Sequence, residues 1–272
     1  MESYSVLMSL YVKEKPEYLT AAIDSILSQT VFPDEIVVVK DGPLSQELDK
    51  IIVDYSNRFP SLFTIVSSEK NIGLGCALNL GLKHCRNELV ARMDTDDIAK
   101  PHRCEKQLEI FQNDPSLDLL GSAVDEFHRT PAEIVSRRVV PCSHPEIYEF
   151  AKRRSAFNHP TVMYKKSKVL SVGGYSDMRR NQDVDLFGRM LFSGCHAANT
   201  EESLLYFRSD DALAKRRRSW ENTRSYIAAI YRFWKMGYSG FGDYLLVAAA
   251  QTAMFLMPVR LQHWVYKKFL RK

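Results

Sequence analysis

Residues 5–27, SVLMSLYVKEKPEYLTAAIDSIL, decide the fold because they contain one strand and the helix that follows it. The run over 5–11 is apolar and β-like, and Pro16 then opens a stretch in which apolar side chains recur at helical spacing. The same pattern returns three times, with strands predicted over 35–40, 63–67 and 89–93. Four such units in succession predict a parallel sheet that is covered by helices on both faces.

The second half of the chain alternates less regularly, and we expect it to complete the same sheet. It predicts strands near 134–140, 161–165 and 204–208 and a helix over 183–192. From Ser219 onward the pattern is helical, and residues 244–257 form an apolar stretch. That stretch is shorter than the ~20 residues of a membrane-spanning helix, so we expect no span there.

The composition is that of an ordinary globular protein. With 272 residues and 45% apolar content, the chain can bury a large core without disulfide bonds, which excludes disordered and fibrous classes. Its five cysteines are odd in number and widely spaced, which favours a reducing cytosol. The first eleven residues lack the regions of a secretory signal, so the sequence predicts that the protein is not exported.

Positive charge is concentrated late in the chain. The formal net charge is only +4, but residues 215–218 read KRRR and five further Lys and Arg residues lie within 260–272. This asymmetry predicts an anionic partner. Charge alone leaves nucleic acid, a phosphorylated substrate and anionic lipid open.

Three carboxylates lie within Asp94-Thr95-Asp96-Asp97, directly after a predicted buried strand. In open parallel sheets, ligands bind beyond the carboxyl ends of the strands. Carboxylates this close repel one another unless a cation compensates them, and Mg²⁺ or Mn²⁺ bound with substrate phosphates is one explanation. A solvated turn in which Asp97 caps the next helix is the other, and the spacing does not choose between them.

Three further segments are candidates, each with a plain structural alternative. Residues 71–75, NIGLG, precede a helix and either present N–H groups to a phosphate or ribose or simply form a tight turn. Asp183 and Asp185 either stabilise the positive end of a helix or include the general base of a transferase. His159 lies beside a predicted strand, where histidine commonly has a structural role.

Several motifs occur together in a fixed order. They are 5–30, 35–43 (EIVVVKDGP), 71–82 (NIGLGCALNLGL), 91–97 (ARMDTDD), 158–175 and 181–190 (NQDVDLFGRM). Together they resemble family 2 of the inverting nucleotide-sugar glycosyltransferases over about the first 210 residues. Residues 204–220, LLYFRSDDALAKRRRSW, resemble in particular the bacterial enzymes that assemble capsule, exopolysaccharide or O-antigen repeats.

The resemblance implies an α/β fold of the GT-A (Rossmann-like) type, with a mostly parallel sheet flanked by helices and a helical C-terminal extension. It implies a catalytic domain over 1–212, with a nucleotide-binding half of about 1–120 and an acceptor half of about 121–212. The extension over 213–272 is then the part expected to associate with a membrane.

The resemblance also implies roles for individual residues. The nucleotide-binding positions are Tyr11 and Glu14 near the base, Asp41 as acceptor of the uracil N–H, Asn71 and Gly73 at the nucleotide's border, Asp94 at the ribose, and also Leu10 and Thr95. Asp96 is the metal ligand, and Arg216 and Arg217 close over the diphosphate. Asp183 is the base, but Gln182 stands where the family has a further acid, which leaves Asp185 open for that role. His159 and Asp185 are placed on the acceptor side.

The resemblance therefore implies an inverting transferase that uses Mn²⁺ or Mg²⁺ and moves a sugar from a UDP-sugar, with UDP-galactose or an N-acetylhexosamine as leading donors. The expected acceptor is a polyprenyl-diphosphate-linked oligosaccharide, and the expected location is the inner face of a bacterial cell membrane, held peripherally at its anionic surface. Nucleic acid is not an expected partner. A nucleotidyltransferase acting on sugar phosphates and a non-enzymatic nucleic-acid- or membrane-binding protein are the alternatives.

Overall fold

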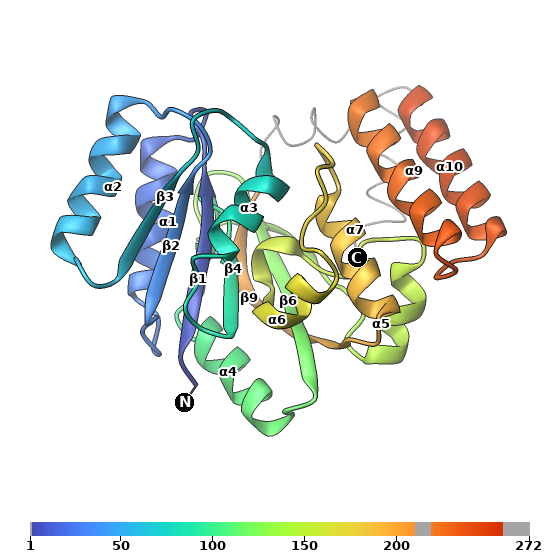
Figure 1. Ribbon diagram of the computed structural model, residues 1–272, viewed down its shortest axis with the longest axis horizontal. Coiled ribbons are helices and arrows are strands. Elements are labelled where there is room, and N and C mark those ends of the chain that lie inside the picture. The colour runs from blue at the N-terminus through green and yellow to red at the C-terminus, as the bar shows by residue number, and fades with distance from the viewer. Residues whose placement is uncertain (1, 210–218, 258–272) are drawn as a thin grey trace.

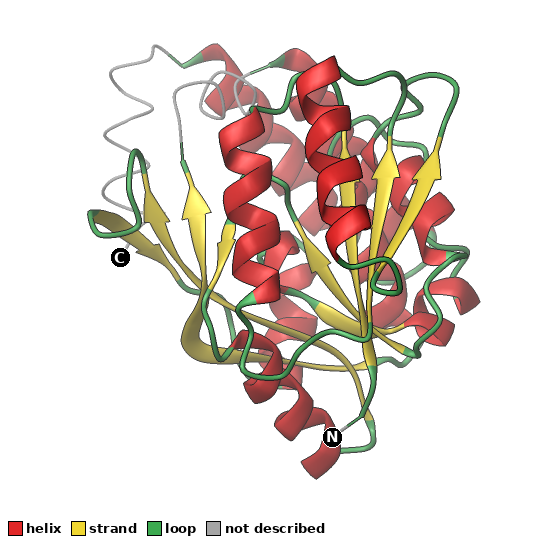
Figure 2. Cartoon of the chain, turned by 90° about the vertical axis from the view of Figure 1, so that its left-hand side faces the viewer, coloured by secondary structure: helices red, strands yellow, loops and turns green. Residues whose placement is uncertain are grey.

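A computed structural model describes residues 2–209 and 219–257, which form one mixed sheet with helices on both faces (Figures 1 and 2). The sheet has nine strands in the order β3-β2-β1-β4-β8-β6-β9-β5, and β7 pairs with β6 off this path. The strands of the first half are β1 (Tyr4–Leu10), β2 (Glu35–Lys40), β3 (Phe63–Ser67), β4 (Leu89–Met93) and β5 (Ile98–Ala99). Strands β1 to β4 are parallel to their neighbours within this group, which confirms the four predicted units.

The second half of the sheet is mixed rather than mostly parallel. Its strands are β6 (Leu117–Phe127), β7 (Ile134–Arg138), β8 (Met163–Lys165) and β9 (His196–Arg208). Strand β6 runs parallel to β9 but antiparallel to β7 and β8, and β8 joins the two halves by antiparallel pairing with β4. The fold class is as predicted, but the pairing in this half is not.

Strand β6 and the first part of β9 are absent from the sequence prediction. Strand β6 is buried along nearly its whole length, so its sequence does not alternate, and Gly121 interrupts the apolar run. A Cβ atom at Gly121 would lie 2.2 Å from the Asn199 side chain of β9. Glycine is therefore required at position 121 because strand β9 approaches closely there. The same glycine interrupts the apolar pattern by which β6 could have been predicted.

The core consists of two apolar clusters, one on each face of the sheet. Strand β1 serves both, because Val6 and Met8 face one cluster while Leu7 faces the other. Helices α1 (Pro16–Leu27), α2 (Gln46–Arg58) and α4 (Arg103–Asn113) cover the first face. Helices α3 (Leu74–Leu82), α5 (His144–Ala151), α6 (Lys166–Ser171) and α7 (Gln182–Phe192) cover the second, and a short 3-10 turn, His159–Thr161, precedes β8.

Two C-terminal helices, α9 (Trp220–Lys235) and α10 (Phe241–Leu256), lie side by side at the end of the molecule opposite α2 (Figure 1). Helix α9 packs on α7, where the ring of Phe233 lies against Gly188. Helix α10 packs on α9 and buries Val247, while much of its remaining apolar surface is exposed. Among the described helices, none combines the length and hydropathy needed to cross a bilayer.

Replacement of Gly188 by alanine should weaken this packing. The added methyl group would lie 2.1 Å from Cζ of Phe233, a distance at which either the ring or α9 must shift. Overpacking of this kind costs about 1–3 kcal/mol of unfolding free energy, which urea denaturation measures. Gly242→Ala in α10 is the matched control, because the added methyl group meets nothing within 4 Å there. Equal stability of the two variants would contradict the tight fit of α9 on α7.

Candidate active site

Polar residues at the carboxyl ends of β1, β2 and β4 surround a cavity of about 550 Å³. Its lining includes all but one of the predicted nucleotide-binding residues, together with the predicted metal ligand: Tyr11, Glu14, Asp41, Asn71, Gly73, Asp94, Thr95 and Asp96. Leu10 is the exception, because its side chain is fully buried. Its carbonyl oxygen accepts the Asp41 N–H at 2.7 Å and so connects Leu10 to a residue that lines the cavity. We call this space the first cavity.

Asp41 joins the end of β2 to the loop before α3. Its Oδ1 accepts the N–H of Ile72 at 2.6 Å, and its Oδ2 accepts the N–H of Gly73 at 3.1 Å and the side-chain amide of Asn71 at 2.9 Å. Gly73 has a φ of +87°, a conformation in which glycine is favoured. A carboxylate offers about four lone pairs, so these bonds leave one acceptor position for a ligand.

A buried arginine holds the first acid of the Asp94–Asp97 cluster. Arg92, on β4, is 1% exposed and donates through both terminal nitrogens to Asp94, with Nη1 to Oδ2 at 2.6 Å. A bidentate pair fixes the orientation of the carboxylate as well as its charge. Thr95 is also fixed, since its hydroxyl donates to Glu14 Oε2 at 2.5 Å.

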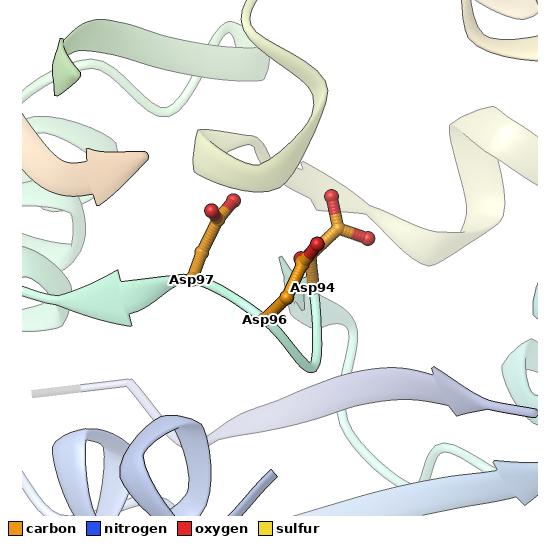
Figure 3. Close-up of side chains that lie close together, drawn as sticks. All are labelled: Asp94, Asp96 and Asp97. Carbon is orange, nitrogen blue, oxygen red and sulfur yellow. The ribbon is translucent and has the colours of Figure 1, made fainter. Parts of the chain in front are cut away.

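The carboxylates of Asp94, Asp96 and Asp97 offer oxygen atoms that all lie within 4.8 Å of one another (Figure 3). Asp97 Oδ1 accepts the backbone N–H of Arg208 at 2.8 Å, whereas its Oδ2 is buried and has no hydrogen-bond partner among the described residues. Burial, with Asp96 and Asp94 nearby, raises the pKa of Asp97 well above its usual range. A set of close carboxylate oxygens with one buried and unpartnered fits a hard divalent cation.

Asp97 does not cap a helix, contrary to the structural alternative drawn from the sequence. The next element is β5, and α4 begins at Arg103 with His102 at the N-cap position. Of the two explanations for the acidic cluster, a cation site including Asp97 therefore remains, although the family resemblance named Asp96 alone as the metal ligand.

A second cavity, of about 430 Å³, adjoins the first and contains Asp183. Four residues line both spaces: Asp94, His159, Phe207 and Asn222. Asp183 lies in the first turn of α7, after Asn181, whose φ of 55° makes it the one non-glycine residue with positive φ in the described chain. Burial raises the pKa of Asp183, and hydrogen bonds from backbone N–H groups of the helix oppose that rise. The carboxyl is thereby adjusted toward the range in which a general base works.

Asp185 does not lie at either cavity. It is fully buried, and its carboxylate is held by Arg189 Nη2 at 2.9 Å and by Arg232 Nη1 of α9 at 3.3 Å. The structure therefore does not place Asp185 on the acceptor side, because the ion pairs turn it into the interface between α7 and α9.

His159 lies where the two cavities meet. Its Nε2 is 2.9 Å from the Tyr175 hydroxyl. Burial, together with the Arg92 cation, lowers the pKa of His159 well below its usual range, so the imidazole is neutral at neutral pH. A neutral imidazole bound to a tyrosine is suited to orienting a ligand rather than to neutralising a phosphate.

The description "Glycosyl transferase family 2" belongs to the family model that matches residues 5–177. The chain belongs to glycosyltransferase family 2. Amylovoran biosynthesis glycosyltransferase AmsE of Erwinia amylovora is 38% identical over 265 residues, which are 97% of this chain and 98% of AmsE. A UDP-Gal:α-D-GlcNAc-diphosphoundecaprenol β-1,3-galactosyltransferase of Escherichia coli is 35% identical over 271 residues, which are 99% of this chain and 97% of the relative.

Solved structures share the fold of this glycosyltransferase. The mannosyltransferase PcManGT of Pyrobaculum calidifontis, in complex with GDP-Man and Mn²⁺, has a TM-score of 0.65 at 14% identity, over 98% of this chain and 79% of that one. Residues 1–349 of Staphylococcus aureus TarS, in complex with UDP, have a TM-score of 0.64 at 16% identity, over 97% of this chain and 78% of that one. At such identities the likeness shows the GT-A fold alone.

The sequence analysis of this glycosyltransferase missed several cations of the first cavity. Arg92, Arg179, Arg180 and Arg208 all line it, whereas the predicted Arg216 and Arg217 lie outside the described residues. Arg92 had a recognisable signal, since an arginine inside the apolar strand LVARM, two residues before an acid, is on the same side of the chain as that acid. Arg208 approaches through strand pairing of distant segments, which no local pattern reveals.

Proposed function

We propose that this glycosyltransferase moves a sugar from a UDP-sugar to a hydroxyl of a lipid-linked acceptor, with inversion at the anomeric carbon. One observation carries the proposal: the cavity that contains Asp183 adjoins the cavity of the nucleotide-binding residues, and Asp94 and His159 line both. A base in one space then faces a donor sugar that reaches the boundary from the other. The Escherichia coli relative supports the choice of UDP-galactose as donor and of a diphosphate-linked lipid as acceptor.

In this mechanism, Asp183 accepts the proton of the acceptor hydroxyl as that oxygen bonds to the anomeric carbon and the bond from that carbon to the diphosphate breaks. Asp41 accepts the uracil N–H, and Tyr11, Glu14, Asn71 and Gly73 line the nucleotide's position. Asp94 is held for the ribose by Arg92. His159 orients the sugars at the boundary of the two cavities.

Asp96 would hold a divalent cation, Mn²⁺ or Mg²⁺, with Asp97 as a second ligand. The cation, when bound, stabilises negative charge on the departing diphosphate. Arg216 and Arg217 would provide further contacts to the diphosphate. Arg208, whose Nε donates to the Asp96 carbonyl at 2.8 Å, fixes the backbone of this acidic turn.

The test is release of UDP from a panel of UDP-sugars with Mn²⁺, with N-acetylglucosamine α-diphosphate on a short alkyl chain as acceptor. We expect UDP release that depends on both metal and acceptor. Release of pyrophosphate from UTP and a sugar 1-phosphate, assayed in parallel, would identify a nucleotidyltransferase instead. Binding of nucleic acid that needs no metal and weakens steeply as the salt concentration rises would favour the non-enzymatic nucleic-acid-binding alternative.

We also propose that residues 213–272 form a C-terminal extension that holds the enzyme peripherally at the inner face of a bacterial cell membrane. Helix α10 supports this, since its outer surface exposes apolar side chains to 49% at Leu245, 57% at Leu246 and 73% at Leu256. Basic residues within 260–272 follow in the sequence, beyond the described part, and suit an anionic surface.

Leu246→Glu should reduce sedimentation with phosphatidylglycerol vesicles several-fold, because it places a charge on the apolar surface of α10. UDP affinity should stay unchanged, since Leu246 lines neither cavity. Val53→Glu is the matched control, at 54% exposure on α2 at the other end of the molecule. Equal vesicle binding by both variants and the wild type would contradict the role of α10.

A further inference from the structure

The second cavity is lined by an arginine that forms no ion pair within the described residues. Two arginines line this cavity, Arg138 and Arg154. Arg138 is paired, with Nη2 3.0 Å from Glu126 Oε1 and its guanidinium 4.5 Å from the centre of the Phe207 ring. Arg154 is exposed and forms no ion pair within residues 2–209 and 219–257, and its guanidinium lies 4.9 Å from the centre of the Phe150 ring.

Helix α9 holds the backbone on which Arg154 lies. The Tyr226 hydroxyl of α9 accepts the N–H of Ser155 at 3.1 Å and donates to the carbonyl oxygen of Arg153 at 3.2 Å. These two bonds hold the backbone on both sides of Arg154. The backbone that carries the Arg154 cation is thus held at the rim of the cavity.

Tyr226 lines the second cavity together with Asp183 and Arg154, one acidic and one basic. Burial raises the pKa of Tyr226, with the Asp183 carboxylate adding to the rise and the Arg154 guanidinium opposing it. Asp94, which lies at the first cavity, also acts on Asp183, whereas Arg154 lines the second cavity only. The second cavity therefore shares the carboxylate of Asp94 with the first cavity and also contains the candidate base, Asp183, and a cation, Arg154, that forms no ion pair within the described residues.

We infer that Arg154 binds the diphosphate of the acceptor, so that the second cavity recognises a sugar diphosphate rather than a neutral sugar. This rests on the proposed function, which places the reacting hydroxyl at Asp183. The acceptor sugar then occupies the space beside Tyr226, and the anionic group on its far carbon meets the guanidinium at the rim. Arginine suits this role because its planar donors match two phosphate oxygens at once.

The far wall of the cavity agrees with an acceptor whose diphosphate continues into an apolar chain. Beyond Arg154 and Phe150, the lining comes from α10 through Gln251, Met254 and Phe255. The ring of Phe255 lies 5.3 Å from that of Trp220, which is 52% exposed. An isoprenoid chain leaving the diphosphate therefore meets aromatic and apolar surface at this end.

The test is calorimetry with geranyl diphosphate, a diphosphate on a short isoprenoid, against enzyme saturated with UDP and Mn²⁺. Arg154→Gln should weaken its binding ~10-fold or more, the scale of a lost charge-assisted contact. Arg153→Gln is the matched control, because that neighbour pairs with Asp243 and does not line the cavity; its affinity should equal the wild type's. Inorganic pyrophosphate should compete with geranyl diphosphate in the wild type and in Arg153→Gln, but not in Arg154→Gln.

Two results would overturn the inference. One is equal affinity of the wild type and Arg154→Gln for geranyl diphosphate, including no binding by either. The other is an Arg154→Gln variant that loses binding to phosphatidylglycerol vesicles but keeps its affinity for geranyl diphosphate, which would make Arg154 a lipid headgroup contact. Metal-dependent UDP binding is measured on the same samples, and its absence from the wild type would instead contradict the proposed function.

Discussion

Asp183→Asn is expected to bind UDP like the wild type but to lower kcat by ~10² or more, the usual scale for loss of a general base. The substitution keeps the size of the side chain and its place at the start of α7, so folding should be unaffected. Rates are measured with the UDP-sugar and acceptor pair found in the donor screen, and UDP affinity by calorimetry.

The pH dependence gives a second readout for the same residue. Burial raises the pKa of Asp183, so protonation removes the base as the pH falls through that raised value. In the wild type, kcat should therefore decline on the acidic side, and the slow reaction of Asp183→Asn should lack this decline.

Asp185→Asn separates the two acids. Because Asp185 is fully buried and pairs with Arg189 and Arg232, removing its charge breaks one ion pair within α7 and one between α7 and α9 and should lower stability. If Asp185→Asn lost turnover at unchanged stability while Asp183→Asn stayed active, the assignment of the base would be wrong.

The second large effect is expected at the acidic cluster. Asp96→Ala should abolish Mn²⁺-dependent UDP binding while the fold stays intact, because both oxygens of Asp94 are engaged by Arg92 and Asp97 Oδ1 by the Arg208 N–H, which leaves Asp97 Oδ2 as a single ligand oxygen. Calorimetry with and without Mn²⁺ measures this, and circular dichroism checks the fold.

Asp54→Ala is the control for Asp96→Ala, since it removes an exposed carboxylate from α2, far from the cavity. It should leave metal-dependent UDP binding unchanged. Wild-type-like binding by Asp96→Ala would remove Asp96 from the role of metal ligand.

The first half of the fold was predictable because each strand and helix there is local and strongly patterned. In β6, by contrast, burial on both faces removes the alternation of apolar and polar residues. Gly121 is required by the close approach of Asn199, which lies about eighty residues away in the sequence. Such a strand can be recognised only once its neighbours are known.

The candidate site divides in the same way. Strand ends bring Asp41 and Asp94 to one cavity, as expected of a parallel sheet. The choice between Asp183 and Asp185 was open, although Asp185 stands four residues before Arg189, the spacing of a helical ion pair. No local sequence pattern predicts the place of Arg154 at the second cavity, because its backbone is held there by Tyr226 of a helix distant in the sequence.

Helix α7 presents the proposed base on one side and anchors α9 on the other, through Gly188 against Phe233 and Asp185 against Arg232. A mutation screen for lost polysaccharide would therefore return two kinds of mutant that look alike in the colony. Substitutions at Arg232 or Phe233 would inactivate the enzyme by displacing α7, the helix that carries the proposed base, although no substrate-binding atom is altered. Only purified protein, compared for stability and nucleotide affinity side by side, would tell these mutants from true active-site lesions.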